Sequence, residues 1–293
     1  MSPSLFLQPG ALIGLFAPAS PTPKDQIKKA ALWVKEMGFT PFNPFDPPKS
    51  RGYLAGSDVE RLEECLNLMA HPKIEALLAV RGGYGSTRLL KSLAPLWSTF
   101  PDKPIIGFSD ITALHLARLA ATGVGGWHGP TLVNLVDPKR RQGLKNALLG
   151  QNKPWNFSKY AIIQKGQAKG RLIGGNLSLL VSLLGSPYWP NSKGAILLLE
   201  DHNEELYRLD RLLTALRLSG RLAGLKGLIF GDFGESVSLN ALKPLLWETA
   251  KECPGPVVRA PYFGHGRMNR PWPFGGLGEL SATEAGGRLT FKL

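Results

Sequence analysis

The sequence predicts an α/β protein in two parts, an N-terminal domain built on a parallel sheet and a smaller, β-rich C-terminal domain. Short apolar runs alternate with amphipathic stretches from residue 11 to about 149, which is typical of β–α–β units. This periodicity fades between Asp137 and Gly170, and the chain ends in short strand-like runs. We therefore expect domains at residues 1–150 and 171–293, joined by a linker at 151–170.

Local signals predict the elements of the first domain in order. Ala11 to Phe16 is a strand, and Lys24 to Met37 is a helix with an apolar stripe that stops at Gly38. Ser57 to Glu60 has the spacing of a capping box, so a helix begins at Asp58 and runs to about Ala70. The remaining elements are a strand at 74–80, a helix from Ser86 and a strand at 104–107.

The second domain alternates helices and strands before its final hairpin. The expected helices cover 176–184, 206–218 and 239–252, and the expected strands cover 195–199 and 227–230. The last two strands meet at Ala285-Gly286-Gly287.

The composition excludes several protein classes. Of 293 residues, 43% are hydrophobic and 19% charged, which excludes disordered and fibrous proteins. The longest apolar runs fall far short of the ~20 residues of a membrane-spanning helix, so we expect no membrane association. Cys65 and Cys253 lie far apart without metal-ligand spacing, which predicts no disulfide framework, no metal site and a reducing compartment.

The N-terminus allows one alternative. Leu12 to Phe16, followed by Ala17-Pro18-Ala19, is similar to the end of a signal peptide. No Lys or Arg precedes this run and the run is brief, which favours a first buried strand.

The net charge of +13 suits a nucleic acid, an anionic surface or an acidic small substrate. The basic residues are scattered, with no run of five and no interleaved aromatic pattern. A generally basic, solvated surface is the favoured interpretation, and we expect no nucleic-acid partner.

Ser109 stands where a strand ends and a helical pattern begins, in Gly107-Phe108-Ser109-Asp110. Such a sharp turn exposes a hydroxyl and aims the first helical amides at it, which provides a nucleophile and part of an oxyanion hole. Ile111 replaces the second Gly of the G-x-S-x-G pattern. On this segment alone, a serine that only caps the helix fits equally well.

A serine nucleophile needs a base and an acid that orients it. Of the five histidines, His265 lies between two glycines in a loop, which lets an imidazole project into a cleft, but no pattern singles it out as the base. Glu200 and Asp201 follow a strongly apolar strand, and strand alternation turns them to opposite faces. Only one of the two carboxylates can therefore join a given site.

A glycine-rich turn, Arg81-Gly82-Gly83-Tyr84-Gly85, separates a strand from a helix. It lacks the Gly-Lys-Ser/Thr of a P-loop and the third Gly of a dinucleotide fingerprint. The turn is better suited to supply a second backbone amide to an oxyanion hole beside Ser109 than to bind a phosphate.

Together, the ordered motifs resemble the LD-carboxypeptidases, cytoplasmic serine peptidases of bacterial murein recycling, over nearly the whole chain. The motifs are Arg81 to Gly85, Gly107 to Asp110, Gly174 to Leu177, Leu199 to Asp201 and Phe263 to Gly266. The resemblance implies a triad of Ser109, Glu200 and His265, with oxyanion amides at Asp110 and Gly83. It also implies release of a terminal D-alanine from murein tetrapeptides, no metal or organic cofactor, and a homodimer.

An exopeptidase must also bind a free carboxylate, for which Arg81 and Arg267 are the candidates. The segment Arg267 to Trp272 is unusually basic and bulky, which leaves the substrate open. The alternative within the superfamily is a microcin-immunity peptidase that cleaves an acyl-adenylate-type amide, with Trp189 or Trp272 as an aromatic platform. The segment Ser186 to Gly194 is short for the added loop of that branch. The alternatives outside it are a nucleotide-binding α/β protein and a nucleic-acid binder.

Overall fold

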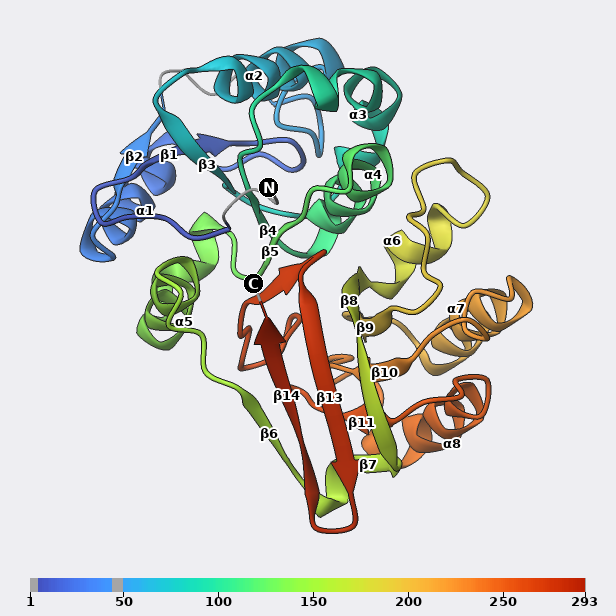
Figure 1. The fold of residues 1–293 in the computed structure, drawn as a ribbon. Helices are drawn as coiled ribbons and strands as arrows, with labels where there is room; N and C mark the ends of the chain where they lie inside the picture. The colour runs from blue at the N-terminus through green and yellow to red at the C-terminus, as the bar shows by residue number, and fades with distance from the viewer. Residues whose placement is uncertain (1–4, 44–49, 293) are drawn as a thin grey trace. The chain divides into compact units, whose positions relative to one another are not determined.

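The computed structural model describes residues 5–43 and 50–292, which form two compact units (Figure 1). The first unit is Met1–Asn152 with Arg270–Trp272, and the second is Lys153–Asn269 with Pro273–Leu293. The chain therefore enters the first unit a second time, for three residues near its C-terminus. The predicted fold class, a parallel-sheet α/β unit followed by a β-rich unit, is confirmed.

The first unit is built on a six-stranded sheet of order β12-β5-β4-β3-β1-β2. The strand pairs from β2 to β5 in this order are all parallel. Its strands are β1 (Leu12–Phe16), β2 (Thr40–Phe42), β3 (Ile74–Ala79), β4 (Ile105–Gly107), β5 (Gly126–His128) and β12 (Trp272–Phe274). Parallel strands bring their carboxyl ends to one edge of the sheet, so the turns after β3 and β4 are neighbours.

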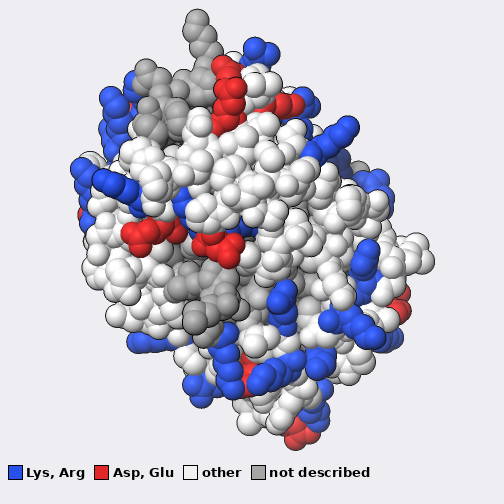
Figure 2. Space-filling model, turned by 45° about the horizontal axis from the view of Figure 1, so that its top comes forward, with Lys and Arg blue, Asp and Glu red and all other residues white. Residues whose placement is uncertain are grey.

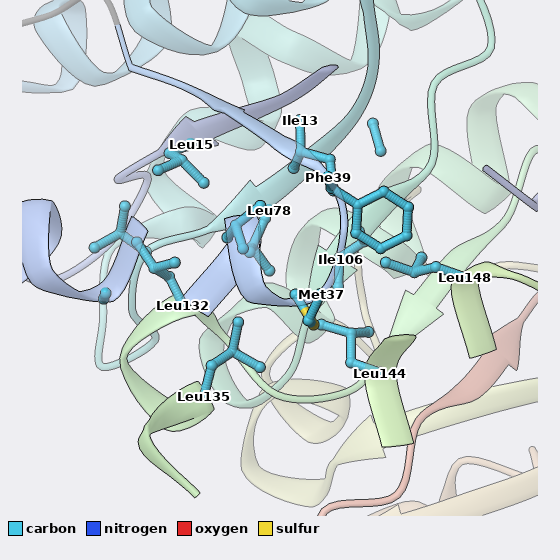
Figure 3. Packing of buried hydrophobic residues seen from close by; sticks show 14 of the residues in the cluster. Ile13, Leu15, Met37, Phe39, Leu78, Ile106, Leu132, Leu135, Leu144 and Leu148 are labelled. Carbon is cyan, nitrogen blue, oxygen red and sulfur yellow. The ribbon is translucent and has the colours of Figure 1, made fainter. Parts of the chain in front are cut away.

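Helices cover both faces of this sheet (Figure 1). They are α1 (Lys24–Glu36), α2 (Asp58–Ala70), α3 (Ser86–Leu93), α4 (Thr112–Thr122) and α5 (Pro138–Leu148). On one face, apolar side chains of α1, α5 and the 3₁₀ turn Leu132–Val136 pack against β1, β3 and β4, as Figure 3 shows around Ile13, Leu78 and Ile106. Strands β1, β3 and β4 are apolar and buried along almost their whole length, which is typical of a parallel sheet covered by helices on both faces.

The capping box predicted at the start of α2 is present. The Glu60 amide donates to Ser57 Oγ at 3.2 Å, and the Ser57 amide donates to Glu60 Oε2 at 2.7 Å. Helix α5 was not among the predicted elements. It begins at Pro138 after Asp137, whose carboxylate accepts a hydrogen bond from the Lys139 amide at 2.8 Å.

The second unit contains an eight-stranded sheet of order β6-β14-β13-β8-β9-β10-β11-β7. Strands β8 to β11 are parallel, and the pairs at both ends of the order are antiparallel. The strands are β6 (Trp155–Ser158), β7 (Ile162–Gln164), β8 (Gly166–Asn176), β9 (Ile196–Glu200), β10 (Gly227–Phe230), β11 (Val257–Arg259), β13 (Leu277–Thr283) and β14 (Gly286–Lys292). In Figure 1, α6 (Leu177–Ser182), α7 (Leu206–Leu218) and α8 (Leu239–Ala250) lie together beside β8 to β11.

The range 151–170, expected as a linker, is largely structured. Strands β6 and β7 and the start of β8 lie within it and belong to the second unit. In β6 the side chains of Trp155 and Phe157 are buried and those of Asn156 and Ser158 are exposed, which is the period of a strand with one covered face. The composition of this range is typical of a linker, but the alternation of buried and exposed side chains in β6 is that of a strand.

The basic residues do not form one continuous patch on the face seen in Figure 2, where groups of Lys and Arg are separated by uncharged surface and by acidic residues. Among the described residues, no helix is both long and apolar enough to cross a membrane.

Candidate active site

Ser109 lies on a strained turn between β4 and α4. Its φ is +61°, a left-handed conformation that a residue with a side chain rarely adopts. The chain leaves β4 at Gly107, turns at Ser109 and continues through the 3₁₀ turn Ser109–Ile111 into α4. A Cβ at Gly107 would lie 2.9 Å from two side-chain carbons of the buried Ile111. The first Gly of the elbow pattern is therefore required, while Ile111 fills the space that it leaves.

The glycine-rich turn after β3 lies against this serine. A Cβ on Gly82 would come within 3.0 Å of the Ser109 Cβ and 3.2 Å of its Oγ. The Gly82 carbonyl accepts a hydrogen bond from the Ser20 amide at 3.2 Å. Because the C=O and N–H of a trans peptide point in opposite directions, the Gly83 N–H points away from that amide. Within the described chain, neither this N–H nor that of Asp110 donates to a protein acceptor.

The carboxylate of Asp110 and the guanidinium of Arg61 fix the two turns. Asp110 is buried and accepts a hydrogen bond from the Ser86 amide at 2.8 Å, which joins the elbow to the start of α3. Burial raises the pKa of Asp110, and the Ser86 hydrogen bond opposes this rise. The buried Arg61 donates to the Gly85 carbonyl at 3.0 Å and to that of Pro18. The contact with Gly85 fixes the backbone at the end of the glycine-rich turn.

Glu200 and His265 form a hydrogen-bonded pair in the second unit. Glu200 ends β9, is fully buried, and its Oε2 lies 2.7 Å from His265 Nδ1. Gly264 has a φ of +101°, and a Cβ there would lie 2.7 Å from the same carboxylate oxygen. Glycine at this position thus lets the loop approach the acid closely.

The environment of His265 favours its charged form. Burial alone would lower its pKa, but the charge and the hydrogen bond of Glu200 act in the opposite direction, and the net effect is a pKa raised above the ordinary value of 6.5. A carboxylate bound at Nδ1 also fixes the tautomer of the ring, which makes Nε2 the nitrogen that can act as the base. The pair can therefore accept a proton at Nε2 and stabilise the resulting imidazolium.

Asp201 serves a different set of contacts. Its carboxylate accepts hydrogen bonds from Asn176 Nδ2 at 3.0 Å, from the Ser178 amide at 3.0 Å and from Ser178 Oγ at 2.7 Å. Strand alternation therefore sends Glu200 to the histidine and Asp201 to the start of α6.

The other four histidines have different surroundings. His115 is buried, its Nε2 lies 3.0 Å from the Gly107 carbonyl oxygen, and burial lowers its pKa to about 4. His128 is buried and stacks on Trp272, with ring centroids 4.8 Å apart. His71 ends α2. His202, to which sequence reasoning gave no role, stacks on His265.

The candidate residues thus fall into two groups. The first unit brings together Ser109, Asp110 and the turn containing Gly83, and the second brings together Glu200 and His265. Arg81 and Arg267 are exposed, one at the start of the glycine-rich turn and one shortly after His265. Among the residues that the structure describes, no cluster of three His, Cys, Asp or Glu side chains could hold a metal ion.

Comparison with known families assigns both parts of the chain. The model of the LD-carboxypeptidase N-terminal domain matches residues 13–129, and that of the C-terminal domain matches residues 169–280. The chain is therefore a hydrolase of the serine peptidase class. It belongs to the LD-carboxypeptidase family.

Similar proteins cover nearly the full length. A probable murein peptide carboxypeptidase of Bacillus subtilis is 32% identical over 95% of this chain and 91% of its own. The murein tetrapeptide carboxypeptidase of Pseudomonas aeruginosa is 32% identical over 90% of this chain and 91% of its own. The crystal structure of muramoyltetrapeptide carboxypeptidase from Oxalobacter formigenes has a TM-score of 0.86 at 27% identity, covering 97% of this chain and 99% of that one. An MccF-like protein from Bacillus anthracis has a TM-score of 0.88 at 25% identity, with full coverage of both chains.

Proposed function

We propose that this protein is a serine LD-carboxypeptidase that releases the terminal D-alanine of murein tetrapeptides, with Ser109, Glu200 and His265 as its triad. The observation that carries the proposal is the buried Glu200 carboxylate 2.7 Å from His265 Nδ1, in a chain of this family. The strained elbow at Ser109 supports the choice of nucleophile, because that geometry exposes a hydroxyl above helical amides.

The chemistry follows from these groups. Ser109 Oγ attacks the scissile carbonyl carbon while His265 Nε2 takes its proton, and Glu200 stabilises the imidazolium. The amides of Asp110 and Gly83 bind the oxyanion, since both point at no protein acceptor among the described residues. His265 then protonates the leaving amine, D-alanine departs, and water hydrolyses the acyl-enzyme.

The free carboxylate of the substrate needs a cation. Arg81 and Arg267 are both exposed and each lies within two residues of a proposed active-site residue, Gly83 or His265. Replacing the responsible arginine by Ala should raise KM with a smaller change in kcat, because binding of the carboxylate is retained in the transition state. If both variants kept the wild-type KM, neither side chain would bind the carboxylate.

The decisive assay is incubation with murein tetrapeptide and mass spectrometry for the loss of one alanine. Ser109→Ala should keep less than about a hundredth of the wild-type rate, because the residual catalysis of a triad variant is small. The exposed Ser92→Ala on α3 is the matched control and should leave the rate unchanged. Activity of Ser109→Ala close to wild type would refute the assignment of the nucleophile.

The pH profile tests the acid and the base. The rate should fall as the pH drops through the raised pKa of His265, because the protonated ring cannot accept the serine proton. Glu200→Gln removes the charge that raises this pKa, so the acid limb should move to lower pH while kcat falls by orders of magnitude. If the acid limb of the pH profile stayed unchanged in Glu200→Gln, Glu200 would not be the carboxylate that acts on the catalytic base.

A microcin-type substrate is less well supported. Each indole proposed as an aromatic platform has a face occupied within its own unit: Trp189 by the Arg221 guanidinium at 5.6 Å, and Trp272 by His128. An aminoacyl sulfamoyl adenosine offered beside the tetrapeptide should be hydrolysed much more slowly. Faster hydrolysis of that compound would reverse the order of the two proposals.

We also propose that the protein acts in the cytoplasm as a homodimer. Both cysteines are free and buried, which fits a reducing compartment. Light scattering of the purified protein would measure its mass, and a monomer across the working concentration range would contradict the dimer.

A further inference from the structure

The ring of His202 lies flat against the ring of His265. The two centroids are 4.7 Å apart and the planes differ by 7°. The exposed His202 lies just beyond the end of β9, two residues after Glu200, and both rings belong to the second unit. The proposed base therefore has one edge held by a carboxylate and one face covered by an aromatic ring.

The backbone of His202 is fixed on several sides. Its amide donates to Asp201 Oδ1 at 2.8 Å, and Asp201 is itself anchored at the start of α6. The chain turns sharply at the next residue, Asn203, whose φ is +59°. The loop after β10 also approaches the ring, since a Cβ on Gly234 would lie 3.3 Å from His202 Nδ1. These contacts restrict the position of the His202 ring.

The hydrogen bond to Glu200 alone does not define the orientation of His265. That bond restrains the position of Nδ1, whereas the position of Nε2 also depends on the tilt of the ring plane, which the side-chain torsions χ1 and χ2 set. A flat ring in contact with the imidazole face opposes a change in this tilt. Parallel, offset stacking is a favoured geometry for aromatic rings, so the contact favours one orientation of the imidazole.

We propose that His202 is a positioning residue, which holds the plane of the His265 imidazole by face-to-face stacking. This inference rests on the proposed function in that it takes His265 as the base. The stacking itself can be measured without any turnover.

The charges around the two rings support a neutral His202. Glu200, Asp201 and Asp232 all favour a proton on His265, whose pKa is raised. Burial and the charge of His265 lower the pKa of His202, while Asp232 and Asp201 act in the opposite direction. The first proton therefore goes to His265, and the two rings titrate as a coupled pair.

Three variants test the role of the ring. His202→Phe keeps a flat ring without a titratable nitrogen, His202→Ala removes the ring, and His71→Ala is a histidine control at the end of α2. We expect His202→Ala to lower kcat by about 10- to 100-fold with KM little changed, as a small misplacement of a catalytic group does. His202→Phe should keep kcat within about threefold of wild type, since it retains the stacked face. His71→Ala should behave as wild type.

Nuclear magnetic resonance of the imidazole nitrogens gives a readout independent of turnover. In Ser109→Ala protein the two rings should titrate in two linked steps, and in the His202→Phe version His265 should titrate alone. A wild-type kcat in His202→Ala would overturn the proposal. An equal loss of kcat in His202→Phe and His202→Ala would also overturn it, because the ring nitrogen and not the stacked face would then be the group that matters. If instead His265→Ala remained active while the rings titrated as a pair, the proposed function would fail and the stacking would stand.

Discussion

Glu64, on α2, predicts an unusual dependence of stability on pH. Its carboxylate is partly buried and accepts a hydrogen bond from the Ala17 amide at 2.8 Å, just after β1. Burial raises its pKa from the ordinary 4.5 to about 7, and the Ala17 hydrogen bond offsets only part of this rise. Folding therefore holds a proton on Glu64 that the unfolded chain releases above pH 4.5.

The size of the effect follows from this difference. A separation of about 2.5 pH units corresponds to about 3.4 kcal/mol at 1.36 kcal/mol per unit. Partial exposure lets water screen the charge, which reduces the expected value to about 2 kcal/mol. Below pH 4.5, Glu64 is protonated in both the folded and the unfolded chain and does not lower the free energy of unfolding. Its destabilising effect grows between pH 4.5 and 7 and is complete above pH 7.

Replacing Glu64 by Gln removes the titration but keeps an oxygen that can accept from Ala17. Relative to wild type, Glu64→Gln should gain about 2 kcal/mol of unfolding free energy between pH 4.5 and pH 8. Urea unfolding followed by circular dichroism and by tryptophan fluorescence measures this, provided that the two transitions coincide. The exposed Glu63→Gln controls for the loss of one charge on the same helix. A difference between Glu64→Gln and wild type that does not change with pH would refute the reasoning.

Four further outcomes are expected. Gly264→Ala should lower kcat more than about tenfold, since its Cβ would press on the Glu200 carboxylate at 2.7 Å; normal turnover would show that the loop can shift freely. Asp201→Asn should lower the unfolding free energy by about 1–3 kcal/mol while kcat stays within a few-fold, and loss of turnover in the folded variant would count against this separation of roles. Ser57→Ala should cost about 1 kcal/mol in urea unfolding through the lost cap, with kcat unchanged, and an unaltered midpoint would mean that the cap contributes nothing. Tetrapeptide hydrolysis should survive excess chelator, and recovery of lost activity by zinc would point to a metallopeptidase.

Elements with a strong local signal were predictable from the sequence. The capping box at Ser57 places the start of α2, and the helix at 206–218 and the strand at 227–230 have the predicted bounds. Helix α5 was missed although Asp137 and Pro138 are a good N-terminal pair, because its basic, weakly amphipathic sequence is typical of a linker as well.

The site was predictable in type more than in arrangement. The strand-to-helix turn at Ser109 indicated an elbow, but only the backbone φ distinguishes a strained nucleophile turn from an ordinary cap. Alternation placed Glu200 and Asp201 on opposite faces, yet it could not say which face meets a histidine. The stacking of His202 depends on two segments more than sixty residues apart, and no local pattern reports such a contact.

The short return of Arg270–Trp272 to the first unit makes the two units inseparable by a single cut. A fragment ending at Asn152 would lack the strand that begins at Trp272, at the edge of the six-stranded sheet, and the ring that stacks on His128. Conversely, a fragment starting at Lys153 would carry that strand without its sheet. The two family domains follow one another in the sequence. The sheet of the first unit nevertheless includes β12, a strand from the C-terminal part of the chain.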